Sequence, residues 1–200
     1  MTTLDTRTEL LSRIRRSQPA PLPLPELPAV IRAADPRPPL QAFRAALERM
    51  GGRWADPPAD GDLDALIHGL YPEAKVVCSA TPEVRGTRAL AAAQAPATLD
   101  DVDVGVVRAA FGVAETGSVL LTQAEFVVPA LGFLSQHLVI LLDPRRIVPD
   151  LHAGYREPVV SEAAYAIFMT GPSATADIEG VLIHGAQGIR SLTVVPLAAP

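Results

Sequence analysis

The chain opens with apolar positions that recur at the spacing of a helix face. Leu4, Leu11 and Ile14 can share such a face, with acidic residues early in the segment and arginines late, the polarity that the helix macrodipole favours. The same spacing recurs over residues 40–50 and 63–70, and the first of these segments stops at a pair of glycines that can end a helix. We therefore expect three amphipathic helices.

Shorter apolar runs, many of them β-branched, alternate with the helical segments and predict strands. They lie around Trp54 and over residues 75–79, 102–107, 111–115, 119–123, 137–142, 164–170 and 191–197. Further helices are expected over residues 88–94, 145–153 and 175–184. Because strands of near-continuous apolar composition are covered on both faces, this alternation predicts an α/β fold with a Rossmann-like, mostly parallel sheet and helices on both faces.

A run of prolines separates the first helix from the rest. Five prolines between residues 19 and 28 remove backbone donors and favour extended geometry, so this stretch is expected to form a stiff strap. We expect residues 1–39 to form an N-terminal helix and proline-rich arm, and residues 40–200 to form the α/β domain. The arm is either a linker or a contact that reaches a neighbouring subunit of a homo-oligomer, because a detached amphipathic helix must bury its apolar face.

Composition narrows the class of protein. Of the 200 residues, 48% are hydrophobic and 20% are charged, yet no stretch reaches the roughly eighteen uncharged apolar residues of a membrane helix. The first twenty residues lack the apolar segment of a secretory signal, so we expect a cytoplasmic location and no membrane partner. The net charge of −5 argues against a nucleic-acid partner, which requires clustered positive charge.

Cysteine and histidine usage bears on metals and cofactors. Cys78 is the single cysteine, so the chain can form neither an internal disulfide nor an iron–sulfur cluster held by several of its own thiolates. His137 and His184 are candidate ligand-binding residues, but no HxH or HExxH pattern surrounds them. We expect no metal site and no cofactor.

A polar turn interrupts two apolar runs in the middle of the chain. Glu115, Thr116, Gly117 and Ser118 place one carboxylate and two hydroxyls at the edge of a buried sheet. Without a local cation, the carboxylate must reach solvent, a remote arginine or a ligand, because burying an unpaired charge is costly. Glu115 is therefore either a solvated turn residue or a candidate catalytic nucleophile or general base.

A second candidate segment follows the strand expected at 164–170. It consists of Gly171, Pro172, Ser173, Ala174, Thr175 and Asp177. The order of residues indicates a strand, a glycine turn and a helix start, with Thr175 as N-cap and the first amides free to bind an anion. We expect Gly171 to have a positive φ angle or to contact a ligand closely, and this segment to line a pocket with Glu115 at the carboxyl ends of the strands. A purely structural helix cap is the alternative, because Asp177 already supplies negative charge there.

Three ordered motifs resemble the LUD-domain family, in its lactate-utilization protein C-like branch. They are Gly112–Ser118, Arg146–Leu151 and Thr170–Glu179, and the resemblance extends from about residue 40 to the C-terminus. Gln187 is a further ligand-binding candidate, in a Gly-Ala-Gln-Gly-Ile segment where relatives read Gly-Val-His-Gly-Pro. The resemblance implies a fold similar to the NagB/RpiA/CoA-transferase-like architecture, in agreement with the alternation of elements.

The resemblance also implies a function. Family members are linked to the oxidation of L-lactate to pyruvate beside partner proteins that carry iron–sulfur clusters, and a single cysteine fits the cluster-free accessory component of such a system. A small carboxylate or phosphate-type ligand is expected. Two alternatives stay open: a free-standing acyl or CoA-type transferase that uses Glu115, by analogy with related folds, and a non-catalytic structural or ligand-binding domain.

Overall fold

The N-terminal helix is a separate unit. The computed structural model describes residues 3–20, 22, 35–177, 179–185 and 187–199, and the chain divides into two compact units, residues 1–33 and 34–200. In the first unit, α1 (Thr3–Arg16) confirms the predicted helix, and Leu10 and Ile14 on it are exposed. Most of the predicted proline strap lies outside the described residues.

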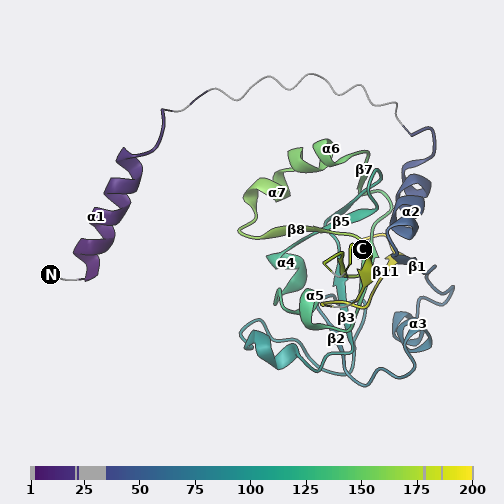
Figure 1. Ribbon diagram of the computed structural model, residues 1–200. Coiled ribbons are helices and arrows are strands. Elements are labelled where there is room, and N and C mark those ends of the chain that lie inside the picture. Colours follow the sequence, from purple (N-terminus) through teal and green to yellow (C-terminus); the bar gives the residue numbers. More distant parts are fainter. Residues whose placement is uncertain (1–2, 21, 23–34, 178, 186, 200) are drawn as a thin grey trace. The chain divides into compact units, whose positions relative to one another are not determined.

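A parallel sheet forms the centre of the second unit (Figure 1). Its strand order is β1-β11-β6-β3-β2, and all four pairings are parallel, which confirms the predicted α/β fold class. The strands are β1 (Arg53–Trp54), β2 (Val77–Ser79), β3 (Val104–Arg108), β6 (His137–Leu142) and β11 (Ser191–Pro196).

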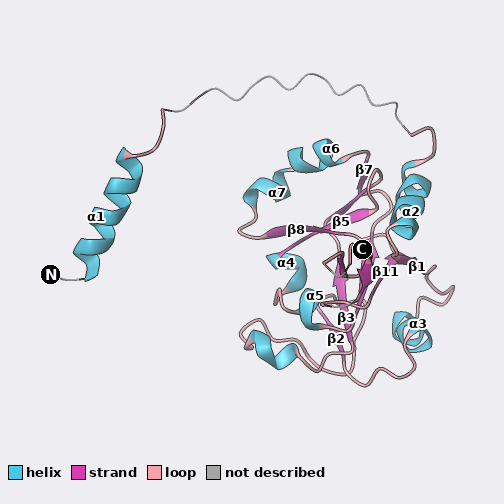
Figure 2. Ribbon diagram, viewed as in Figure 1, coloured by secondary structure: helices cyan, strands magenta, loops and turns pink. Residues whose placement is uncertain are grey.

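A second sheet adjoins the carboxyl ends of two central strands (Figure 2). Its order is β7-β4-β5-β8, and it is largely antiparallel; only the β4–β7 pairing is parallel. Its strands are β4 (Phe111–Val113), β5 (Ser118–Thr122), β7 (Ile147–Val148) and β8 (Ala166–Met169). The sequence predicted most of these strands but not their separate sheet. Four residues between β4 and β5 are too few for a parallel crossover, so that pair must form a hairpin.

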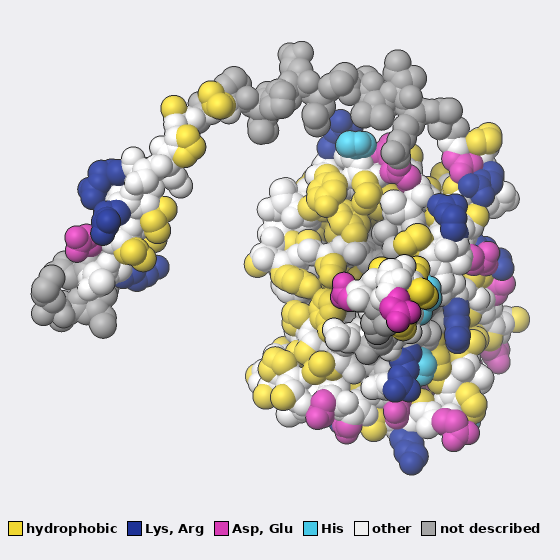
Figure 3. Space-filling model, in the orientation of Figure 1, with side chains coloured by type: hydrophobic (Ala, Val, Ile, Leu, Met, Phe, Trp, Pro, Cys, Tyr) yellow, Lys and Arg dark blue, Asp and Glu magenta, His cyan; other side chains and the backbone are white. Residues whose placement is uncertain are grey.

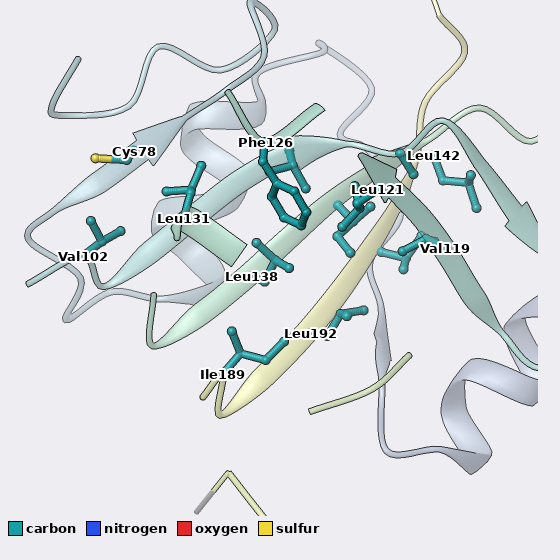
Figure 4. Packing of buried hydrophobic residues seen from close by; sticks show 14 of the residues in the cluster. Cys78, Val102, Val119, Leu121, Phe126, Leu131, Leu138, Leu142, Ile189 and Leu192 are labelled. Atoms are coloured by element: carbon teal, nitrogen blue, oxygen red, sulfur yellow. The ribbon is translucent and has the colours of Figure 1, made fainter. Parts of the chain in front are cut away.

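Helices cover both faces of the central sheet. The helical elements are α2 (Pro39–Arg49), α3 (Leu63–Leu70), η1 (Pro96–Leu99, a 3₁₀ turn), α4 (Gln123–Phe126), α5 (Leu131–Leu134), α6 (Leu151–Arg156) and α7 (Pro158–Glu162). Side chains of α2, α4 and α5 pack with Leu138 and Ile140 on one face, whereas α3 packs with Val139 and Leu141 on the other. Figure 4 shows Phe126, Leu131 and Leu138 of the first cluster. The alternation along β6 therefore decides which residues meet which helix.

Helices α6 and α7 cover the far face of the second sheet. Leu151, Val159 and Phe168 pack there against a small buried cluster, while neighbouring β5 residues point into the main core. Tyr155 remains 64% exposed beside Phe168, and hydrophobic side chains gather over α6, α7 and β8 at the surface (Figure 3). No helix in the described ranges is both long and apolar enough to cross a bilayer.

Three predicted helices were wrong or displaced. Residues 88–94 form turns, because Arg88 joins Cys78 in a β-bridge and its guanidinium binds Asp101 at 2.7 Å. The helix expected at 145–153 begins only at Leu151, after the short strand β7. The described residues of segment 175–184 form no helix; instead β9 (Ala174–Thr175) pairs with β10 (Ile183–His184) as an antiparallel ribbon.

Phe43 packs between the two sheets, and its contribution to stability can be measured. It is fully buried on α2, and its ring meets Trp54 of the central sheet and the position of Gly112 in the second sheet. We expect Phe43→Ala to lower the free energy of unfolding by about 3–5 kcal/mol, as for other large core truncations. Phe133→Ala, at a ring that is 37% exposed, should cost clearly less in the same urea titration. Equal losses would show that the packing of Phe43 between the two sheets contributes no more to stability than a partly exposed ring.

Candidate functional site

The β4–β5 turn places Glu115 at the start of another helix. The half-buried Glu115 carboxylate accepts a hydrogen bond from the Leu151 amide at 3.3 Å, at the first residue of α6. Asp150 caps the same helix by accepting from the Ala153 amide at 2.7 Å. This backbone partner is one that the sequence did not indicate, and it gives Glu115 a structural task. A catalytic role for Glu115 stays a prediction.

The hydroxyls and the glycine of that turn are also engaged. Thr116 Oγ1 donates to Ser118 Oγ at 2.8 Å. Gly117 has a φ angle of 67°, and a Cβ on it would lie 2.2 Å from the Leu47 backbone nitrogen. The turn therefore lies directly on the last turns of α2, at a distance that only glycine permits.

The second candidate segment is a strand end and a ribbon rather than a helix start. Thr175 was predicted as an N-cap, but it lies in β9, where its hydroxyl donates to Asp177 Oδ2 at 2.8 Å and accepts from the Asp177 amide at 3.3 Å. A threonine followed two residues later by aspartate closes a local turn as readily as it caps a helix, because both use the same hydrogen bonds. The expected anion site on helix amides is therefore wrong for this segment.

Gly171 confirms the prediction of a left-handed conformation. Its φ angle is 62°, and a Cβ on it would lie 2.2 Å from the Met50 carbonyl oxygen. The ring of Pro172 then packs on Gly51, 3.3 Å from where a Cβ there would be. The segment is thus fitted to the turn that ends α2.

The predicted segments meet around the end of α2. Thr170 Oγ1 donates to the Gly117 carbonyl at 3.0 Å, which joins the first segment to the second. The Ser173 amide donates to the Ile189 carbonyl at 2.9 Å, and the Ser173 carbonyl accepts from Gly185. We call this assembly the glycine junction: residues 114–118 and 170–173 packed around residues 46–52 of α2 and its turn, together with Gly185 and Ile189, which bind Ser173.

The other candidates are divided between the junction and a distant edge. The ring of His184 lies near Gly51, and both His184 and Gln187 are exposed. His137 begins β6, away from Glu115. Two cavities in the described part of the chain are lined neither by Glu115 nor by residues 171–175, and a pocket that these residues share stays a prediction.

One of these cavities lies at the amino edge of the central sheet. It has a volume of about 370 Å³ and is lined by residues at or just before the starts of β1, β3, β6 and β11, and by residues 70–74 at the end of α3. Its charged and aromatic residues are Arg53, Tyr71, Glu73, Asp103, His137 and Arg190. We call it the arginine cavity. Of these six residues, the sequence had indicated only His137.

Hydrogen bonds fix His137 within the arginine cavity. Its Nδ1 lies 2.8 Å from Ser191 Oγ, and its ring stacks on Tyr71 with centroids 4.5 Å apart. The Tyr71 hydroxyl bonds to Ser191 Oγ at 3.1 Å and to Thr193 Oγ1 at 2.9 Å. Burial and the charges of Arg53 and Arg190 lower the pKa of His137, against an opposing effect of Asp103, so the ring is neutral at neutral pH.

The glycine junction positions both arginines. Arg53 follows the Gly51-Gly52 turn on which Gly171 and Pro172 pack. Arg190 follows Ile189, and its Cα lies 3.1 Å from where a Cβ on Gly185 would be. A sequence signal existed for these residues, because each arginine stands at the start of an apolar strand and all strands of a parallel sheet begin at the same edge.

A larger cavity of about 410 Å³ shares Tyr71 and lies beside α3. Two charged side chains that line it form an ion pair with each other, since Arg85 Nε lies 3.4 Å from the Asp64 carboxylate. The Gly86 amide donates a hydrogen bond to the same carboxylate. Across the residues that the structure describes, no group of three or more His, Cys, Asp or Glu side chains could hold a metal ion.

Comparison with known proteins identifies the α/β unit. A family model described as the LUD domain matches residues 46–196. The chain is also similar to a solved structure, a DUF162 family protein from Deinococcus radiodurans, with a TM-score of 0.60 and 20% identity over 79% of this chain and 95% of that one. At this identity the likeness shows the fold. A search of curated proteins finds no match.

Gly171 and Gly180 form a matched pair for testing the junction. Both have positive φ angles, but a Cβ on Gly180 would meet nothing within 4 Å, whereas one on Gly171 would collide with the Met50 carbonyl. We expect Gly180→Ala to cost about 1–2 kcal/mol from backbone strain alone. Gly171→Ala should cost a further 1–3 kcal/mol or so from overpacking, measured by denaturant unfolding. Equal losses of stability in the two variants would mean that Gly171 can move away from the Met50 carbonyl at no cost.

Proposed function

Because the chain belongs to the LUD-domain family, we propose that it is a cluster-free accessory component of a system that oxidises L-lactate to pyruvate beside iron–sulfur partner proteins. The observation that carries this proposal is the LUD match, which spans residues 46–196 and so nearly the whole α/β unit. In this role the chain binds a small carboxylate and works together with its partners in the cytoplasm.

The position of Cys78 supports the assignment of the iron–sulfur clusters to partner proteins rather than to this chain. Its side chain is fully buried in the main core and its Sγ accepts a hydrogen bond from Arg88 Nε at 3.4 Å. A cluster with several thiolate ligands needs cysteines that this sequence lacks, so it belongs to a partner protein.

The surroundings of Glu115 favour the accessory role over an acyl or CoA-type transferase. A nucleophilic carboxylate needs an open approach to its substrate. Here the Glu115 carboxylate accepts from the Leu151 amide and helps to start α6, and it lines neither described cavity. The arginine cavity in turn favours ligand binding over a purely structural domain.

A growth experiment in the organism that encodes the chain tests the role. Deleting the gene should abolish growth on L-lactate as sole carbon source and leave growth on pyruvate unchanged, because only the oxidation step is lost. Re-expression of the chain should restore growth on L-lactate. Unimpaired growth of the deletion strain on L-lactate would refute the proposal.

A further inference from the structure

We propose that the arginine cavity is a binding site for a small 2-hydroxy- or 2-oxo-carboxylic acid, with Arg53 and Arg190 holding the carboxylate and His137 the neighbouring oxygen. This inference deepens the proposed function and rests on it for the identity of the acid. It adds the site, the residues and the chemical reason for the choice of ligand.

The charges of the cavity suit a single carboxylate. Arg53 and Arg190 are exposed at the cavity, and neither forms an ion pair with another described residue. A guanidinium can bind a carboxylate through two parallel hydrogen bonds. Two acidic residues, Glu73 and Asp103, share the cavity, so a ligand of higher negative charge such as phosphate would meet repulsion that a monoanion largely avoids.

The Asp103 carboxylate binds backbone amides rather than the arginines. Its Oδ2 accepts from the amides of Lys75 at 2.7 Å and Val76 at 2.9 Å, which ties the start of β3 to the segment before β2. These hydrogen bonds lower the pKa of Asp103 and keep it ionised. The arginines are therefore left to bind a ligand while Asp103 limits its charge.

The oxygen next to the carboxylate is matched by His137. Its Nδ1 is held by Ser191 Oγ, whereas Nε2 forms no hydrogen bond within the described part of the chain. Ser191 is joined through Tyr71 to Thr193, and every link of this series is a hydroxyl that can either donate or accept. The imidazole can therefore present Nε2 as a donor to a ketone or as an acceptor to a hydroxyl. The same site then suits both members of a hydroxy acid and keto acid pair.

The cavity has room and an apolar wall for the rest of such an acid. At about 370 Å³ it lies near the lower end of ligand pockets, and Leu70, Pro72 and Ala74 line it beside the polar groups. A methyl or another short alkyl group has an apolar surface to contact there.

Calorimetric titration of the purified full chain tests the site. L-lactate and pyruvate should bind, whereas propionate, which has no oxygen on the second carbon, and inorganic phosphate should bind at least about tenfold more weakly. Arg53→Gln and Arg190→Gln should each weaken L-lactate binding by about tenfold or more. Arg156→Gln, an exposed arginine on α6 outside the cavity, is the matched control and should bind as the parent does.

A second variant separates the roles of the side chains. His137→Gln should lower the affinity for L-lactate and pyruvate and leave that for propionate nearly unchanged. The proposal fails if no acid binds, if propionate binds as tightly as L-lactate, or if both arginine variants bind like the parent. Binding that survives alongside normal growth of the deletion strain would refute the metabolic role alone. Loss of growth without binding would refute the site alone.

Discussion

The contact of two glycines with the backbone of α2 is the constraint on which the rest of the second unit depends. Gly117 and Gly171 come so close to Leu47 and Met50 that no side chain fits between them. The second sheet, the β9–β10 ribbon and the end of α2 are thereby held at fixed distances. Because protein interiors are close-packed, a shift at this point must be passed on to neighbouring elements rather than absorbed locally.

That constraint connects the family motifs to the chemistry of the fold. The motifs line neither of the described cavities. Arg53 and Arg190 do line one of them, and each stands next to a segment of the glycine junction: Arg53 follows the turn on which Gly171 and Pro172 pack, and Arg190 contacts Gly185. Ligands usually bind at the carboxyl ends of the strands of an open α/β sheet. Here the carboxyl ends of β3 and β6 continue into the second sheet, and the Ala110 amide, just after β3, donates a hydrogen bond to the Leu120 carbonyl of that sheet. The amino edge is left with a cavity and two arginines.

The sequence predicted those elements whose local pattern and tertiary role agree. The segment 40–50 is helical in pattern and buries that same face, and the apolar runs of β3, β6 and β11 needed no further information. The alanine-rich segment 88–94 was misread because helix propensity alone is weak without an apolar face, and the tertiary contacts of Arg88 prevail. Thr175 was misread because a cap and a local turn use the same hydrogen bonds. Gly171 was read correctly because a glycine before a proline at a strand end has few other uses, whereas Arg53 and Arg190 become neighbours only when the strand order is known.

In this account the glycine junction sets the geometry of the arginine cavity. The calorimetric affinity for L-lactate of Gly171→Ala, compared with that of Gly180→Ala, tests this most directly when each is measured where circular dichroism shows the variant to be folded. Gly171→Ala should bind L-lactate several-fold more weakly than the parent, because the backbone leading to Arg53 must move, and Gly180→Ala should bind as the parent does. Parental affinity in a folded Gly171→Ala protein would contradict the claim.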